Sequence, residues 1–175
     1  IKTLDPEEFP IIPSLKGDEP FVVVETAVLC RAMSQVVGMA GQSQSRPEIS
    51  GVFFTFTKEA VRIVATDSFR LAEKIIAFEK PQPSEPSFIL PQKTVRELIM
   101  ILGERPGKTN IYFSPSQAVF DYAPEGQAAQ LRIQIVSRLI EGEYPHYQEV
   151  IPPGYKTKVR LPKSGFSNHL KAGRI

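Results

Sequence analysis

The feature of this sequence that most constrains its fold is an internal duplication. Two short apolar runs, at 21–24 and 88–90, are each followed by apolar residues at the i, i+3, i+4, i+7 spacing of an amphipathic helix. These helical positions are Leu29, Ala32, Met33 and Val36 in the first copy, and Val95, Leu98, Ile99 and Leu102 in the second. Leu29 and Val95 stand 66 residues apart, which predicts two copies of one structural unit.

Each predicted helix is followed by three strand-like runs. These lie at 52–57, 61–65 and 71–78 after the first helix, and at 110–113, 118–122 and 131–136 after the second. Each copy therefore has the order strand, helix and three strands, written βαβββ. A third copy opens with a predicted strand at 159–161 and a helix start at 162–164, followed by Phe166 and Leu170, and the end of the chain cuts this helix off at Ile175.

Helix starts and connectors also leave sequence signals. Thr94 and Glu97 have the S/T-x-x-E spacing of a capping box, and an earlier start of the same helix near Pro91 is the alternative. Residues 79–87 hold three prolines and predict an extended connector between the copies. Two further connectors are predicted at 5–20 and 144–154.

The composition restricts the class of protein but says nothing about its activity. A chain of 175 residues with 42% hydrophobic residues suffices for a sizeable core. No apolar run approaches the ~18 residues of a membrane span, and the first residues do not resemble a signal peptide. The missing initial Met indicates a cut from a longer chain. Cys30 is the only cysteine, which excludes an internal disulfide, fits a reducing cytoplasm, and predicts a buried or half-buried thiol.

Recognisable catalytic and metal-binding patterns are absent from the sequence. It has no P-loop and no G-x-G-x-x-G spacing. His146 and His169 lack Cys or acidic partners at ligand spacing, so no metal or other cofactor is predicted. A hydrolase using Ser68 and Asp67 would need a nucleophile elbow and a base, and neither is visible. Asp67 is instead predicted to stabilise a turn, and an enzyme is the weaker hypothesis.

Two surface features are candidate binding sites. Arg31, Lys93 and Arg96 lie off the apolar stripes of the predicted helices, where they either follow a phosphate backbone or are ordinary solvated charges. The net charge of +2 is too small for a protein that wraps nucleic acid with its whole surface. The segment 65–72 mixes apolar, hydroxyl and guanidinium groups between two strands, which suits a small peptide-binding groove or a plain β-turn.

Three segments resemble signatures of the bacterial sliding clamps, the DNA polymerase III beta subunit family. Residues 65–72, Ala-Thr-Asp-Ser-Phe-Arg-Leu-Ala, resemble the A-T-D-[GS]-[HYF]-R-L-A signature of that family's middle domain. Residues 46–52 resemble the preceding R-P-x-L-x-G-[VI] segment. Residues 137–147 resemble the closing S-[KR]-L-[IV]-[ED]-G-x-[FY]-P-x-Y segment. The three motifs occur in the family's order and spacing.

The resemblance implies a fold and a domain organisation. The implied fold is the α+β sliding-clamp fold, in which two βαβββ repeats place two helices on one face of antiparallel sheets. Residues 1–20 are similar to the tail of the first clamp domain and its linker. Residues 21–153 are similar to the complete middle domain, and residues 154–175 to the start of the third domain. Family members are head-to-tail dimers of three-domain subunits whose helices line a central hole.

The resemblance also implies a function and partners. It implies a non-catalytic processivity factor that encircles duplex DNA without sequence preference and tethers the DNA polymerase III alpha subunit, the clamp loader and other proteins with a clamp-binding motif. The implied location is the cytoplasm, at the nucleoid during replication, with no membrane contact. Arg31, Lys93 and Arg96 become the candidate DNA-facing residues.

The family's peptide-binding pocket maps onto eight positions of this chain. They are Ile49, Thr66, Ser68, Phe69, Arg70, Leu71, Pro145 and Val150. The implied apolar floor consists of Ile49, Leu71, Pro145 and Val150, and the implied backbone-directed polar contacts come from Thr66 and Arg70. Two positions depart from the family: Phe69 replaces a frequent His or Tyr, and Glu149 stands where some relatives have Arg.

The resemblance leaves part of the pocket and the whole dimer interface outside this chain. In the family, the third domain completes the pocket, and the first and third domains form the interface, so we expect a monomer with an incomplete pocket. One alternative is a stand-alone α+β peptide-binding module without DNA contact, which would not need the strand–helix start at 159–175. The other is the hydrolase, whose activity Ser68→Ala would abolish.

Overall fold

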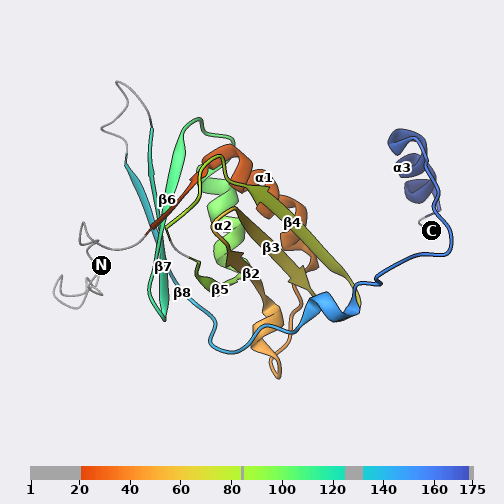
Figure 1. Ribbon diagram of the computed structural model, residues 1–175, viewed down its shortest axis with the longest axis horizontal. Helices are drawn as coiled ribbons and strands as arrows, with labels where there is room; N and C mark the ends of the chain where they lie inside the picture. Colours follow the sequence, from red (N-terminus) through yellow and green to blue (C-terminus); the bar gives the residue numbers. More distant parts are fainter. Residues whose placement is uncertain (1–20, 84, 125–131, 174–175) are drawn as a thin grey trace, which may run out of the picture. The chain divides into compact units, whose positions relative to one another are not determined.

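The structure, a computed structural model, describes residues 21–83, 85–124 and 132–173 (Figure 1). It divides into two units, Ile1–Pro145 and His146–Ile175. The tail of a preceding domain and the connector predicted within 1–20 lie outside the described residues, as does Leu131 at the start of the last predicted strand.

The first unit consists of two successive copies of the same five elements. The first copy comprises β1 (Phe21–Glu25), α1 (Thr26–Val36), β2 (Gly51–Phe56), β3 (Ala60–Thr66) and β4 (Leu71–Ala77). The second comprises β5 (Ser87–Pro91), α2 (Gln92–Leu102), β6 (Lys108–Phe113), β7 (Gln117–Ala123) and β8 (Ile133–Arg138). Two 3₁₀ helices, η2 (Val37–Met39) and η3 (Pro47–Ser50), connect α1 to β2. The predicted duplication of the βαβββ order is confirmed.

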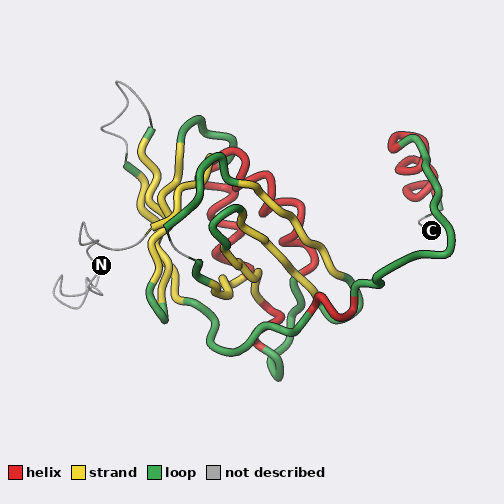
Figure 2. Tube along the Cα trace, in the orientation of Figure 1, coloured by secondary structure: helices red, strands yellow, loops and turns green. Residues whose placement is uncertain are grey.

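The two repeats exchange their first strands. β1 pairs with β6, and β5 pairs with β2, so each four-stranded antiparallel sheet combines one strand of one repeat with three of the other. The strand orders are β1-β6-β7-β8 and β4-β3-β2-β5. Figure 2 shows the strands of both sheets in yellow, with the red helices α1 and α2 beside them. Because neither repeat completes a sheet alone, the two form one folding unit.

The core lies between the helices and the inner faces of the sheets. Helix α1 packs against α2 and against β3 and β4. Seven of the eight predicted helical core positions are buried: Leu29, Ala32, Met33 and Val36 on α1, and Val95, Leu98 and Leu102 on α2. Ile99 is partly buried. The strands alternate as well, with Val52, Phe54 and Phe56 of β2 turned into the core. The amphipathic spacing therefore predicts the core correctly.

The start of helix α2 is held by a tertiary contact instead of a side-chain cap. Helix α2 begins at Gln92, directly after Pro91, and its N-cap makes no side-chain hydrogen bond. The capping box predicted from Thr94 and Glu97 is therefore wrong, and the earlier start is confirmed. The Thr94 hydroxyl is instead 3.0 Å from that of Ser137 on β8, and this hydrogen bond ties the first turn of α2 to the sheet.

The second unit contains η5 (Tyr147–Val150) and α3 (Lys163–Ala172). The helix predicted after Pro162 is present, but the strand predicted at 159–161 is wrong, because these residues are exposed and irregular. A strand needs a neighbour for its backbone hydrogen bonds, and the described part of this unit contains none. Helix α3 has no buried residue. Across the described ranges of the chain, no helix has the length and apolar character required to cross a membrane.

Candidate functional site

The segment 66–70 forms a tight turn between β3 and β4. The Asp67 backbone N–H donates to the Arg70 carbonyl oxygen at 3.2 Å. The Asp67 Oδ1 atom accepts from the backbone N–H groups of Phe69 at 3.0 Å and Arg70 at 2.7 Å. Asp residues favour turns because their carboxylates satisfy nearby backbone N–H groups in this way. The turn-stabilising role predicted for Asp67 is confirmed.

The same carboxylate also binds the Arg70 side chain. The Nε and Nη2 atoms of Arg70 donate to Asp67 Oδ2 at 3.0 and 2.7 Å. The hydrogen bonds from the Arg70 side chain, followed by those from the backbone N–H groups of Arg70 and Phe69, lower the pKa of Asp67 to about 2. Asp67 is therefore ionised at neutral pH, and Arg70 is held by its own turn.

The hydroxyl groups at the turn have partners within the chain. The Thr66 hydroxyl donates to the Arg70 carbonyl oxygen at 2.8 Å and accepts from the Ser68 N–H at 3.1 Å. Ser68 has a φ of 75°, a left-handed backbone conformation that residues other than glycine rarely adopt. The Arg46 Nη1 atom donates to the Ser68 hydroxyl at 3.3 Å. Thr66 and Arg70 are the residues expected to contact the backbone of a partner. In this structure, their hydrogen bonds stabilise the turn.

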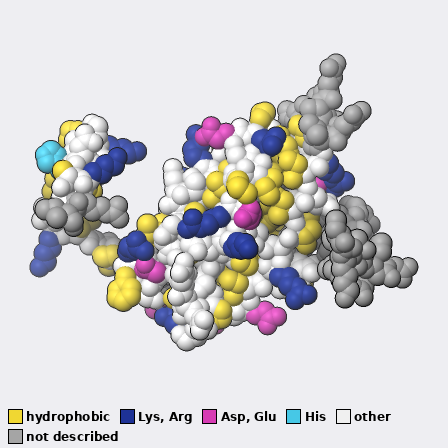
Figure 3. Space-filling model, turned by 180° about the vertical axis from the view of Figure 1, so that it is seen from behind, with side chains coloured by type: hydrophobic (Ala, Val, Ile, Leu, Met, Phe, Trp, Pro, Cys, Tyr) yellow, Lys and Arg dark blue, Asp and Glu magenta, His cyan; other side chains and the backbone are white. Residues whose placement is uncertain are grey.

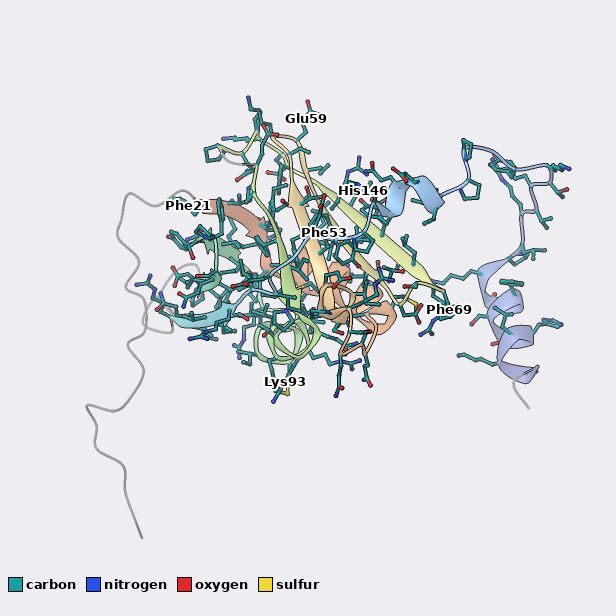
Figure 4. All side chains as sticks on the ribbon, turned by 90° about the horizontal axis from the view of Figure 1, so that it is seen from below. Phe21, Phe53, Glu59, Phe69, Lys93 and His146 are labelled. Carbon is teal, nitrogen blue, oxygen red and sulfur yellow. The ribbon has the colours of Figure 1, made fainter. Side chains whose placement is uncertain are left out.

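These hydrogen bonds leave Phe69 exposed at the tip of the turn. Its side chain is 95% exposed, the largest exposure among the large hydrophobic residues in the described ranges. Figure 4 shows Phe69 at one end of the unit, beyond the strands. An aromatic side chain held in water by a hydrogen-bonded turn is a candidate contact for an apolar partner.

The apolar candidates Leu71 and Pro145 are associated with one sheet. Ala72 and Ile76 of β4 pack against the core, so strand alternation turns Leu71 to the opposite, outer face. Leu71 and Pro145 are half-buried. Pro145 follows Tyr144, whose ring stacks on Phe53 of β2 at 4.7 Å between centroids, and Phe53 also alternates with core residues. Leu71 thus belongs to the outer face of β4-β3-β2-β5, and Pro145 directly follows a residue that stacks on Phe53.

The remaining pocket candidates differ in burial. Ile49, on η3, is 6% exposed, and its side chain packs against Gly41. It supports the η3 loop from inside and exposes little surface. Val150 ends η5 in the second unit and is 71% exposed. The structure therefore brings Thr66, Ser68, Phe69, Arg70 and Leu71 together on one hairpin.

Two further residues, Arg46 and Glu48, lie beside the turn. Arg46 contacts Ser68 and pairs with Glu48, its Nε atom lying 3.2 Å from Glu48 Oε1. Both belong to the 46–52 motif, so the motif contained the signal, but the contact with the turn depends on how η3 packs.

A separate cleft of about 490 Å³ is lined by β1, the start of α1, the end of β4 and the connector after it. None of the predicted site residues lines this cleft.

The three cationic candidates lie on adjacent helices. Arg31 on α1 and both Lys93 and Arg96 on α2 are exposed, and Figure 4 shows Lys93 on the outer side of α2. Within the described ranges, none of the three takes part in an ion pair. Figure 3 shows one whole face of the molecule, where Lys and Arg side chains are separated by uncharged and acidic ones. Such dispersed cations can contact phosphates without forming a continuous basic surface.

Comparison with known proteins identifies this fold. A family model described as "DNA polymerase III beta subunit, central domain" matches residues 23–146. The chain belongs to the DNA polymerase III beta subunit family. Its resemblance to sliding clamps, first visible in three motifs, is confirmed, and so is the α+β clamp fold.

Individual relatives in this family are distant in sequence and close in fold. The chain is 26% identical over 163 residues to the beta sliding clamp of Staphylococcus aureus, covering 93% of this chain and 41% of that protein. The Bacillus subtilis DNA polymerase sliding clamp matches 86% of this chain and 37% of its own, at 26% identity and a TM-score of 0.76. The Streptococcus pyogenes beta subunit matches 98% of this chain and 44% of its own, at 22% identity and a TM-score of 0.83. The chain spans about two fifths of the length of the curated relatives it matches.

Proposed function

We propose that this chain is part of a sliding clamp, a non-catalytic processivity factor that encircles duplex DNA and tethers a polymerase to it. The main observation behind the proposal is the match of residues 23–146 to the central domain of the DNA polymerase III beta subunit. In this proposal, residues 1–20 belong to the first clamp domain and its linker, residues 21–153 form the middle domain, and residues 154–175 begin the third domain. The complete protein acts as a homodimeric ring in the cytoplasm, at the nucleoid during replication.

Helices α1 and α2 face the DNA in this proposal. The exposed side chains of Arg31, Lys93 and Arg96 support it, because they lie on two helices that pack together. Phosphate contacts of this kind hold a duplex without reading its sequence. A few dispersed cations favour sliding, since each additional phosphate contact strengthens electrostatic binding.

Partner proteins bind at the outer face of β4-β3-β2-β5 in this proposal. The partners are the DNA polymerase III alpha subunit, the clamp loader and other proteins that carry a clamp-binding motif. The proposed contacts are Ile49, Thr66, Ser68, Phe69, Arg70, Leu71, Pro145 and Val150. The exposed Phe69 ring and the half-buried Leu71 support an apolar anchor there. A Pseudomonas aeruginosa sliding clamp, similar in fold at a TM-score of 0.73, has been solved bound to griselimycin.

An amide NMR titration with the peptide Gln-Leu-Ser-Leu-Phe tests the peptide site. We expect shifts at Ile49, Thr66, Arg70, Leu71 and Val150. Leu71→Ala should weaken binding by about tenfold, or about 1.4 kcal/mol, because the contacts whose truncation costs more than 1 kcal/mol cluster at the buried centre of an interface.

The matched control for this titration is Ile75→Ala. Ile75 lies on the same strand and the same face as Leu71 and is 46% exposed, but it lies outside the proposed contacts, so this variant should bind like the unmodified chain. Equal weakening by both substitutions, or shifts confined to α1 and α2, would contradict the site. If no shift appears, the titration is repeated on the full-length protein. The absence of shifts there as well would refute the proposed pocket.

A further inference from the structure

Both arginines at the Phe69 turn are already paired within the chain. Arg70 donates twice to Asp67 Oδ2, and Arg46 pairs with Glu48. The two guanidinium side chains are 62% and 48% exposed, while the Asp67 and Glu48 side chains are only 20% and 21% exposed. The surface around Phe69 therefore presents positive groups whose charge is compensated by acids lying beneath them.

Asp67 does two separate things through its two carboxylate oxygens. Oδ1 accepts the backbone N–H groups of Phe69 and Arg70, and this fixes the shape of the turn. Oδ2 accepts the guanidinium of Arg70, and this fixes where Arg70 points. Hydrogen bonds between ionised partners are shorter and stronger than neutral ones. An acidic ligand would have to compete with a carboxylate that the turn itself holds in place.

We propose that Asp67 sets the charge preference of the Phe69 turn, so that the turn takes an uncharged, apolar peptide segment and discriminates little in favour of acidic ones. Asp67 is a positioning residue that acts through Arg70 and touches no ligand itself. The inference rests on the proposed peptide-binding function and specifies the chemistry of the partner at the same site. It follows that peptide binding by the unmodified chain depends weakly on salt, because no new ion pair forms.

Asp67→Asn separates the two roles of the carboxylate. The Asn Oδ1 atom can still accept both backbone N–H groups, and Asn is itself a favourable turn residue. Its amide nitrogen is a donor and cannot accept from a guanidinium, so Arg70 is released while the turn persists. The matched control is Glu25→Gln, which removes one negative charge from β1, in the other sheet, where Glu25 lies 3.9 Å from Lys108.

The experiment compares two amidated peptides, Gln-Leu-Ser-Leu-Phe and Gln-Leu-Asp-Leu-Phe, by NMR titration at low and high sodium chloride. For the unmodified chain and Glu25→Gln, we expect the two affinities to agree within about twofold at both salt concentrations. For Asp67→Asn, the acidic peptide should gain about two- to fivefold at low salt, as for a new exposed ion pair. High salt should remove this gain. The Arg70 Nε–H resonance should also move in the free Asp67→Asn variant and stay in place in Glu25→Gln.

A loss of folding or positioning alone would weaken both peptides together, so a selective, salt-sensitive gain identifies the charge effect. If all three proteins show the same relative affinity for the acidic and neutral peptides, and the same salt dependence of binding, the inference is overturned and the proposed function is left intact. A strong, salt-sensitive preference for the acidic peptide in the unmodified chain would overturn it too. If neither peptide binds any of the proteins, including the full-length forms, the proposed peptide site fails and the inference fails with it.

Discussion

Gly51, the first residue of β2, occupies a position where the surrounding atoms leave no room for a side chain. A Cβ atom there would lie 2.4 Å from Ile89 Cγ2 and 2.8 Å from the Leu90 carbonyl oxygen. The Leu90 carbonyl belongs to β5, which is paired with β2 at this point and cannot retreat without breaking the ladder. We expect Gly51→Ala to lower the free energy of unfolding by about 1–3 kcal/mol, the usual cost of overpacking, measured by urea denaturation.

Gly38 provides the matched control, because no atom lies within 4 Å of the Cβ position there. Gly38→Ala should change the free energy of unfolding by no more than about 0.5 kcal/mol. If the two alanine variants lose equal stability, steric crowding is not the reason for Gly51. The motif at 46–52 contains this glycine, but the need for glycine comes from Ile89 and Leu90, which are far away in the sequence and occupy the space a side chain would need. The same holds for Arg46, whose contact with Ser68 joins two motifs that the sequence shows only separately.

The burial of helix α1 can be tested through Cys30, which is 3% exposed. Burial raises the pKa of its thiol to about 11, so at pH 8 the native thiol is protonated as well as covered. A thiol reagent should therefore react with the native chain slower than with the urea-unfolded chain by on the order of a thousandfold or more, as expected for an opening that resembles global unfolding. Rapid labelling of the native chain would show that α1 does not stay packed.

The raised pKa of Cys30 also fixes the sign of a pH effect. The unfolded thiol loses its proton near its ordinary value of 9.0 and the folded one at about 11, so the unfolded chain binds fewer protons in this window. Stability should fall as the pH rises from about 9 to about 11. Cys30→Ala removes this contribution, and its stability should fall less steeply over the same range.

Helices and strands are predictable here where one segment determines its own structure. The apolar spacing of α1 and α2 is local, and the structure confirms it. The start of α2 is not local in this sense: Thr94 fits a capping box by spacing, but its hydroxyl bonds Ser137 on β8. The strand predicted at 159–161 has the right side chains and lacks a neighbouring strand in the described part of its unit, so it does not form.

The whole first unit depends on an exchange that the duplication alone does not reveal. Two βαβββ copies could form two separate sheets, yet β1 joins the sheet of the second copy and β5 that of the first. Period and spacing describe each copy by itself, whereas strand pairing depends on how the copies meet. The exchange also accounts for the glycine at position 51 of the first copy, because β5 of the second copy blocks the Cβ position there.

The four outer edges of the two sheets lead to a prediction about assembly. At β1, Gln82 Oε1 accepts the Val23 N–H at 3.1 Å, and at β5 the Ile140 N–H donates to the Ile89 carbonyl oxygen at 2.9 Å. The other two edges, β4 and β8, present charged residues such as Lys74 and Arg138. Charged edge residues oppose edge-to-edge pairing. We expect light scattering to give the monomer mass of 19.5 kDa.

Lys74→Val tests whether charge at the β4 edge helps to keep the chain monomeric. The substitution places a third apolar residue beside Ile75 and Ile76, and such an edge is a template for another chain, so the variant should show a rising mass with concentration. Lys58→Val makes the same change in the turn between β2 and β3 and should remain monomeric. A stable dimer of the unmodified chain would contradict the prediction, because the charged edges would then not be enough to keep the chain monomeric.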